Sequence, residues 1–159
     1  MLTAEENEMM TKVGPGTPAG ELLRRYWHPV AIAADLTPEN PTKFVRILGE
    51  DLVLFQTTGG EVGLLHDRCA HRGVSLSYGR VEERGLACAY HGWLYDIKGN
   101  CLETPAEPAD SQICQTVKQK AYPVRKLAGL YWAYLGPQPA PEIPKYDVWA
   151  RTDGWHWLR

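Results

Sequence analysis

The middle of the chain alternates apolar and polar positions with a period of two, as residues 43–48 illustrate. Polar turns at residues 49–51 and 57–60 separate this segment from apolar segments at residues 52–56 and 62–65. Short period-two segments joined by tight polar turns are typical of antiparallel β-strands. The pattern therefore predicts a mainly β fold, an antiparallel β-sandwich or small barrel.

The second half of the chain continues this pattern with shorter apolar segments. Further strands are expected at residues 86–89, 93–97, 101–103, 117–122, 124–126 and 130–135. Residues 104–116 are polar and contain prolines, so we expect an irregular excursion there. Proline cannot donate a hydrogen bond to a strand ladder, and the proline-rich stretch at residues 136–141 is therefore expected to end the β module.

The N-terminal part has helix signals instead. Thr3-Ala4-Glu5-Glu6 has the form of a capping box, which predicts a short helix over residues 4–12. Thr17 followed by Pro18 fits the N-cap and first position of a second helix. An extended segment is expected over residues 26–32. The predicted fold thus has short N-terminal helices before its strands.

Composition narrows the class of protein. A chain of 159 residues with 44% apolar and 23% charged residues fits one soluble globular domain with appendages. The net charge of −2 argues against a nucleic-acid surface, which needs a basic excess. The sequence contains no run of 18 apolar residues and no secretory signal, so we expect a cytoplasmic protein without a membrane partner.

Two short segments carry candidate metal ligands. Cys69 and His71 are separated by one residue, and Cys88 and His91 by two; both pairs lie next to glycines, in predicted turns. Two thiolates and two imidazoles on two loops predict a metal centre. Zinc is the alternative metal, because two Cys and two His satisfy its tetrahedral site. Zinc sites usually pair Cys with Cys and His with His, whereas each loop here carries a mixed pair.

The two segments resemble a known motif. Cys69-x-His71-Arg72-Gly73 followed by Cys88-x-x-His91-Gly92-Trp93 resembles the Rieske motif of non-haem iron oxygenases, over a module from about residue 43 to residue 135. Residues 23–29 and 130–137 also resemble the oxygenase component, in particular the phthalate-dioxygenase branch.

The resemblance implies a [2Fe–2S] cluster, with Cys69 and Cys88 on one iron and His71 and His91 on the other. Two thiolates instead of four make the centre less negative, so its reduction potential should exceed that of an all-cysteine ferredoxin. Respiratory Rieske proteins carry an additional cysteine in each loop, and these cysteines form a disulfide. The matching residues here are Val74 and Tyr90, and no such disulfide is expected.

The resemblance also assigns two cluster neighbours. Respiratory Rieske proteins have a serine hydrogen-bond donor where this chain has Trp93, whereas Tyr95 matches their second donor. A lost donor destabilises the reduced, more negative cluster. We therefore expect a potential near the low end of the Rieske range of about −150 to +300 mV. Trp93→Ser is expected to raise this potential, and we expect the Trp93 ring to shield the cluster edge.

Other candidates have simpler interpretations. Cys101 and Cys114 are expected to be small buried hydrophobic residues. His66, like His28, is expected to be structural, because the ligand set is complete without it. Arg68 and Arg72 flank the first loop and are either a solvated rim or a docking surface for an acidic partner.

Intact Rieske oxygenases hold a second, mononuclear Fe(II) through two histidines and a carboxylate. Of the five histidines, only His156 follows the module, so this chain is expected to relay electrons rather than to activate oxygen. We interpret it as the Rieske part of an aromatic-ring-hydroxylating type of oxygenase subunit, whose catalytic domain is absent from this chain. A standalone Rieske ferredoxin is the alternative.

The oxygenase interpretation carries further expectations. The electron donor would be a reductase containing flavin and iron–sulfur groups. The acceptor would be the catalytic domain or a neighbouring oxygenase subunit, in a homotrimer of the intact protein. We expect an N-terminal lead, the Rieske domain and the start of a linker at residues 1–42, 43–140 and 141–159. The tail tryptophans Trp149, Trp155 and Trp157 would form an exposed apolar patch unless another domain covers them.

Overall fold

The computed structural model describes residues 1–108 and 110–155, and it divides into two compact units. The first unit contains residues 1–33, residues 47–50 and the described residues from 123 onward. The second unit contains residues 34–46 and 51–122. Both are built on short antiparallel strands, so the predicted mainly β fold with short N-terminal helices is confirmed.

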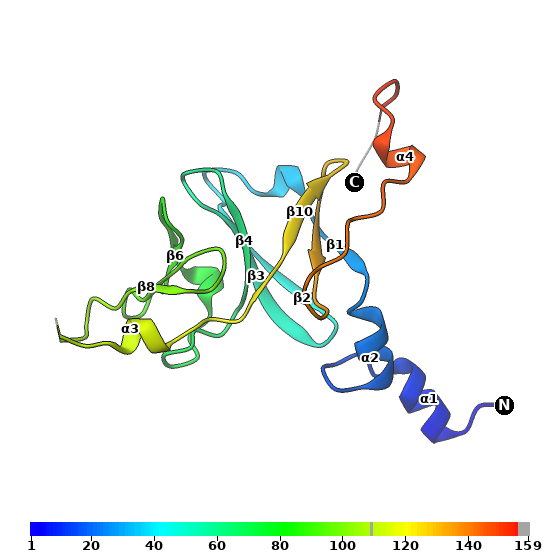
Figure 1. The fold of residues 1–159 in the computed structure, drawn as a ribbon, viewed down its shortest axis with the longest axis horizontal. Coiled ribbons are helices and arrows are strands. Elements are labelled where there is room, and N and C mark those ends of the chain that lie inside the picture. The colour runs from blue at the N-terminus through cyan, green and yellow to red at the C-terminus, as the bar shows by residue number, and fades with distance from the viewer. Residues whose placement is uncertain (109, 156–159) are drawn as a thin grey trace. The chain divides into compact units, whose positions relative to one another are not determined.

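The first unit is organised around a three-stranded sheet in the order β1-β11-β10 (Figure 1). Its strands are β1 (Trp27–Ile32), β10 (Val124–Leu127) and β11 (Leu130–Tyr134). Ala128 and Gly129, both with positive φ, join β10 to β11, as a tight two-residue hairpin loop requires. The register of β1 against β11 shifts between Pro29 and Ala31, where proline cannot donate to the ladder.

The helices of this unit are α1 (Ala4–Thr11), α2 (Pro18–Leu23) and α4 (Asp147–Ala150). The capping box of α1 is present in both directions, because Thr3 Oγ1 accepts from Glu6 N and the Glu6 carboxylate accepts from Thr3 N. Thr17 caps α2 by accepting from Gly20 N. Both N-terminal helices are thus confirmed, and α1 ends one residue before the predicted end.

The second unit contains two four-stranded antiparallel sheets, in the orders β2-β3-β4-β9 and β5-β6-β7-β8. The strands of the first sheet are β2 (Thr42–Ile47), β3 (Glu50–Gln56), β4 (Val62–His66) and β9 (Ala121–Tyr122). Those of the second are β5 (Arg80–Val81), β6 (Leu86–Ala87), β7 (Leu94–Tyr95) and β8 (Cys101–Glu103). Short helical turns η1 (Ala33–Asp35) and η2 (Leu76–Tyr78) and helix α3 (Ile113–Thr116) complete the elements.

One hydrophobic core lies within the second unit. It contains Cys69, Cys88, Trp93 and Tyr95, which the sequence placed at the candidate centre. Cys101 and apolar residues of β3, β4, η2 and β6 complete it. These core residues are Val53, Phe55, Leu65, Cys69, Leu76, Leu86, Cys88, Trp93, Tyr95 and Cys101. The predicted metal-binding thiols are therefore part of the core rather than of the surface.

Two segments differ from the pattern-based expectation. A strand was expected over residues 117–122, but only β9 forms at its end. Lys118 makes an isolated bridge with Asn100 and Gln119 N donates to Gly99 O at 2.7 Å, whereas β9 pairs with β4, so the segment changes its partner on the way. The polar segment after β8 was expected to be irregular, but it contains the four-residue helix α3. No apolar periodicity in the sequence predicts this helix. Among the described residues, no helix is long and apolar enough to cross a membrane.

Candidate metal centre

Two loops of the same backbone form carry the predicted ligands. In the first, Cys69 N donates to Val74 O at 2.9 Å, and Gly73 N donates to Cys69 O at 2.8 Å. In the second, Cys88 N donates to the carbonyl of residue 93 at 2.9 Å, and Gly92 N donates to Cys88 O at 2.9 Å. The hydrogen bonds thus join equivalent positions of two six-residue loops, residues 69–74 and 88–93.

Each loop turns at a glycine. Gly73 and Gly92 have φ values of +71° and +72°, in the left-handed region that other residues adopt only with strain. The histidine is the third residue of the first loop and the fourth residue of the second. The two loops thus have the same backbone form, and they differ in where the histidine lies: Cys-x-His in the first and Cys-x-x-His in the second.

The structure brings the four predicted ligands together in two pairs. The Nδ1 atoms of His71 and His91 face each other at 3.2 Å, with ring centroids 4.8 Å apart. The thiols of Cys69 and Cys88 are neighbours, and both are buried. The imidazoles are half-buried. Soft donors therefore lie on the core side, and nitrogen donors on the more exposed side.

The electrostatics of the thiol pair favour a bound cation. Burial raises the pKa of the Cys88 thiol; the backbone N–H groups of Tyr90 and His91 lower it, and the Cys69 thiol raises it again. The net direction is upward, so two thiolates at this depth need a positive charge beside them. A metal centre supplies that charge.

The donor set fits a two-iron cluster. A tetrahedral zinc needs four donors around one ion. The donors gather two and two, which matches a cluster in which each iron takes two protein ligands. That these four residues bind iron stays a prediction.

Tyr95 contacts one of the two thiols. Its hydroxyl oxygen lies 3.3 Å from Cys69 Sγ. Burial, followed by the hydrogen bond to Cys69, raises the pKa of Tyr95, so the hydroxyl keeps its proton and is the donor once Cys69 is a metal-bound thiolate, which can only accept. The ring itself is completely buried in the core.

Trp93 lies against the imidazole pair. Its ring stacks on the His71 ring with centroids 4.4 Å apart and an interplanar angle of 2°, and it is only 1% exposed. Its indole Nε1 is buried and has no hydrogen-bond partner among the described residues. Buried donors almost always have an acceptor, so an acceptor from outside the described residues is expected there.

Sequence reasoning missed a buried amide that holds the first loop. The side chain of Gln119, 2% exposed, accepts from Ala70 N at 2.9 Å. Its Nε2 donates to His66 O at 2.6 Å and to Arg68 O at 2.8 Å. The Gln119 side chain thus joins His66 and Arg68, which precede the first loop, to Ala70 inside it. No motif marks a neutral residue whose partners lie about fifty positions earlier.

Sequence reasoning also missed Asp67, which supports the same loop. Its buried carboxylate accepts from Ser75 Oγ at 2.9 Å, from Ser77 N at 3.1 Å and from Ser77 Oγ at 2.6 Å. These bonds tie the residue two positions before Cys69 to the chain that follows the loop. An Asp followed by two serines at alternate positions is the signal that could have found it.

The remaining candidates are distributed as follows. His66 Nδ1 accepts from Arg68 N at 3.4 Å, and His28 Nε2 contacts Leu23 O at 2.8 Å, which are structural roles. Arg68 and Arg72 are exposed. Cys101 is buried, as expected, whereas Cys114 is only half-buried, so the expectation that both are buried is wrong for Cys114.

The tail tryptophans do not behave alike. Trp149 packs against Trp132, with ring centroids 4.7 Å apart, and against Tyr146. Trp155 is 94% exposed. Trp157 and His156 lie outside the described residues. Of the three tryptophans, Trp155 is thus the exposed one within the described tail, where the side chains of Tyr146 and Val148 are exposed as well.

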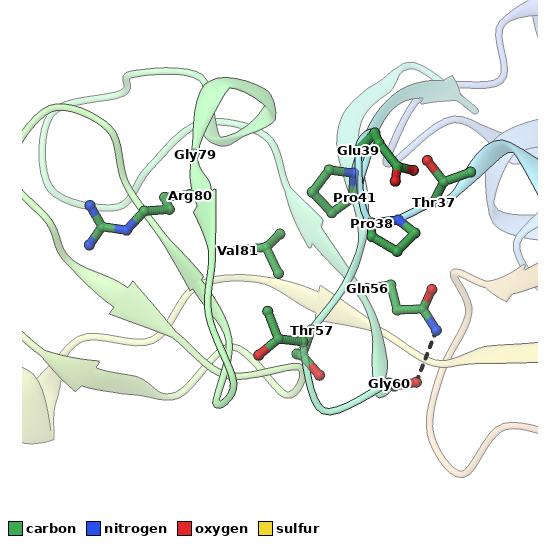
Figure 2. A pocket seen from close by; sticks show the side chains of 11 residues that line it. Thr37, Pro38, Glu39, Pro41, Gln56, Thr57, Gly60, Gly79, Arg80 and Val81 are labelled. Carbon is green, nitrogen blue, oxygen red and sulfur yellow. Dashed lines mark hydrogen bonds between the residues drawn. The ribbon is translucent and has the colours of Figure 1, made fainter.

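A cavity of about 620 Å³ lies elsewhere in the second unit (Figure 2). Figure 2 shows the loop of Thr37, Pro38 and Pro41 on one side and Val81 and Arg80 on the other. None of the four predicted ligands lines it. The cavity is thus separate from the candidate metal centre.

The fold and the two cysteine–histidine loops define a class of protein, and comparison with known proteins agrees. Residues 26–125 match the Rieske [2Fe-2S] domain family, and the chain belongs to this family. It is 46% identical over 153 residues to the phthalate 4,5-dioxygenase oxygenase subunit of Pseudomonas putida, covering 94% of this chain and 34% of that protein.

A second relative is the 5,5'-dehydrodivanillate O-demethylase oxygenase subunit of Sphingobium sp. (strain NBRC 103272 / SYK-6). It is 46% identical over 157 residues, covering 97% of this chain and 37% of that protein. The predicted likeness to oxygenase subunits of the phthalate-dioxygenase type is confirmed. The chain spans about a third of the length of these curated relatives.

The fold is also shared with a solved structure. The reduced complex between oxygenase and ferredoxin in carbazole 1,9a-dioxygenase matches with a TM-score of 0.68 and 29% identity, over 85% of this chain and 33% of that chain. The mainly β Rieske-type fold is thus found in a solved oxygenase of the same family.

Proposed function

We propose that this chain transfers single electrons through a [2Fe–2S] cluster, as the Rieske part of an oxygenase subunit. One observation carries the proposal: two loops of equal backbone form present two buried thiols and two imidazoles whose Nδ1 atoms face each other at 3.2 Å. Membership in the Rieske family supports the identity of the cluster.

Cys69 and Cys88 would hold one iron, and His71 and His91 the other. When bound, the cluster supplies a one-electron redox couple. The chain's own residues then set its surroundings. The thiols lie in the apolar core, which excludes water, and Tyr95 donates toward Cys69 Sγ. The imidazoles are half-buried and their Nδ1 atoms face each other, so each Nε2 lies on the part of its ring away from that contact.

The partners follow from the relatives. A similar solved structure is a complex between an oxygenase and a ferredoxin, which supports an iron–sulfur or flavin–iron–sulfur reductase system as electron donor. The acceptor would be a mononuclear Fe(II) in a catalytic domain beyond this chain, in the same or a neighbouring subunit of a homotrimer. The oxygenase-subunit relatives, of which the chain covers about a third, support this over a standalone ferredoxin.

The same proposal sets the chain's organisation. Residues 1–42 would lead into the Rieske domain of residues 43–140, and residues 141–159 would begin the linker to the catalytic domain. The location would be cytoplasmic. The relatives include both an O-demethylase and a dioxygenase, so the substrate and the type of oxygenation depend on parts outside this chain.

Anaerobic reconstitution with iron and sulfide tests the proposal. We expect iron and sulfide in equal amounts, visible absorption that bleaches on one-electron reduction, and nitrogen couplings from two histidines in the electron paramagnetic resonance of the reduced protein. His71→Ala should abolish this spectrum, whereas His66→Ala, which changes a histidine outside the set, should leave it intact. A colourless, zinc-loaded protein or a spectrum without nitrogen couplings would overturn the proposal.

A further inference from the structure

Two cysteines outside the predicted ligand set lie together in the second unit. Cys101 begins β8, and Cys114 lies on α3. Their Sγ atoms are 3.3 Å apart, and the Cys114 thiol donates toward the Cys101 sulfur. Both are free thiols. A disulfide has an S–S distance of about 2.05 Å, so the two sulfurs need to approach by only about 1 Å to bond.

Pro105, which lies between these cysteines in the chain, packs against the second cluster loop. A Cβ atom on Gly92, in the second cluster loop, would be 3.4 Å from Pro105 Cγ. After α3 the chain continues to Gln119, whose side chain holds the first loop through Ala70 N. A covalent link between β8 and α3 would therefore fix the segment that contacts one loop and precedes the anchor of the other.

We propose that Cys101 and Cys114 are a redox-active thiol pair, which peroxides convert to a disulfide that locks this segment against the cluster loops. Peroxide first oxidises one thiol to a sulfenic acid and releases water. The second thiol then displaces the hydroxyl group as water, and the S–S bond forms. The two thiols together lose two electrons and two protons, and hydrogen peroxide is reduced to two waters.

The surroundings of the two sulfurs set the order of these steps. Cys114 is half-buried and Cys101 is buried, so peroxide reaches Cys114 first. Burial, and then the hydrogen bond shared with Cys114, raises the pKa of Cys101 to about 12, which makes its thiol the less reactive toward peroxide. Cys101 is then the resolving thiol, held at contact distance. In a reducing compartment the link would be a reversible response to oxidant.

Thiol mapping tests the proposal on the intact chain. The holoprotein is treated with hydrogen peroxide, its free thiols are alkylated without reduction, and its peptides are analysed by mass spectrometry. We expect a linked peptide pair containing Cys101 and Cys114, lighter by two hydrogen atoms than the separate peptides, which dithiothreitol releases. Cys114→Ser is the control and should give no linked pair.

A second measurement tests whether the disulfide locks the segment between the two cysteines. Amide hydrogen exchange in peptides between Cys101 and Cys114 should be slower in the oxidised than in the reduced protein, and unchanged by peroxide in Cys114→Ser. Both cysteines alkylated after the peroxide is consumed, or Cys114 over-oxidised beside a free Cys101, would overturn the proposal. Equal exchange in both forms would overturn the locking. Thiol mapping needs no cluster, so its failure is distinguishable from failure of the proposed electron transfer.

Discussion

At the scale of single residues, the hydroxyl of Tyr95 makes the clearest contribution to the candidate centre. It is buried, keeps its proton and donates toward Cys69 Sγ. A donor to sulfur stabilises the more negative, reduced state. The ring packing is separate from this effect, because a phenylalanine would fill the same volume.

Tyr95→Phe is therefore expected to lower the reduction potential. One hydrogen bond contributes about 1 kcal/mol, which corresponds to about 40 mV for a one-electron couple. Redox titration followed by electron paramagnetic resonance measures the shift. Tyr78→Phe, at a tyrosine that is 82% exposed, is the control and should leave the potential unchanged. An unchanged potential in folded Tyr95→Phe would contradict the role of the hydroxyl.

Gln119→Leu should destabilise the first loop. The substitution leaves the N–H of Ala70 and the carbonyls of His66 and Arg68 without this partner. We expect a loss of about 3 kcal/mol in the free energy of unfolding, measured with urea, and faster bleaching of the cluster. The matched control is Gln115→Leu, at an exposed glutamine of α3. Equal losses in both variants would show that Gln119 is no special anchor.

The structure also changes the test at Trp93. The sequence treats this residue as a lost donor, and Trp93→Ser is expected to raise the potential. Because the ring is 1% exposed and stacks on His71, the substitution also creates a cavity that costs about 3–5 kcal/mol. The potential must therefore be compared only in variants that remain folded. A potential that is equal or lower in folded Trp93→Ser would contradict the expectation.

At the scale of elements, a buried ion pair holds α2's end to the turn between β2 and β3 within the first unit. The Arg24 guanidinium pairs with Glu50 at 2.5 Å and donates to Leu48 O at 2.8 Å. Both charged side chains are about 6% exposed. Removing one partner leaves the other charge buried, which costs far more than breaking an exposed pair.

Arg24→Met should lower the free energy of unfolding by about 3–5 kcal/mol. Arg46→Met breaks the pair with Asp51, in which the Arg46 side chain is 70% exposed, and should cost much less. Urea denaturation monitored by tryptophan fluorescence compares the two. Similar costs for the two variants would mean that the buried pair adds nothing beyond a surface ion pair.

Local chemistry made some elements predictable and left others hidden. Helices α1 and α2 could be predicted because Thr3 and Thr17 are recognisable N-cap residues, whose side chains bond to a backbone N–H three residues later. The pairing of two ligand loops also follows from spacing and from glycine. Helix α3, the Gln119 anchor and the contact of Cys101 with Cys114 depend on tertiary contacts. No local pattern encodes these, since each joins positions brought together only by folding.

At the scale of the molecule, the candidate centre joins a buried and an accessible side. The thiols lie in the core of the second unit, while the imidazoles are half-buried and Arg68 and Arg72 of the first loop are exposed. The chain as a whole carries a net charge of −2. Arg72 follows His71 directly in the chain, so this exposed cation is a local departure from the overall charge, and an acidic electron donor would be attracted to it.

Arg72→Glu is therefore expected to slow electron transfer from an acidic ferredoxin by about tenfold at low ionic strength. Salt screens charges beyond about 8 Å at physiological ionic strength, so the difference from the unsubstituted protein should shrink as salt is added. Stopped-flow bleaching of the cluster at several salt concentrations measures both effects. Lys98→Glu makes the same charge change in the turn at the other end of β7 from the second loop, and it should have a smaller effect. If both variants slow the reaction equally, net charge rather than the rim of the first loop steers the donor. If neither does, Arg72 is only a solvated side chain.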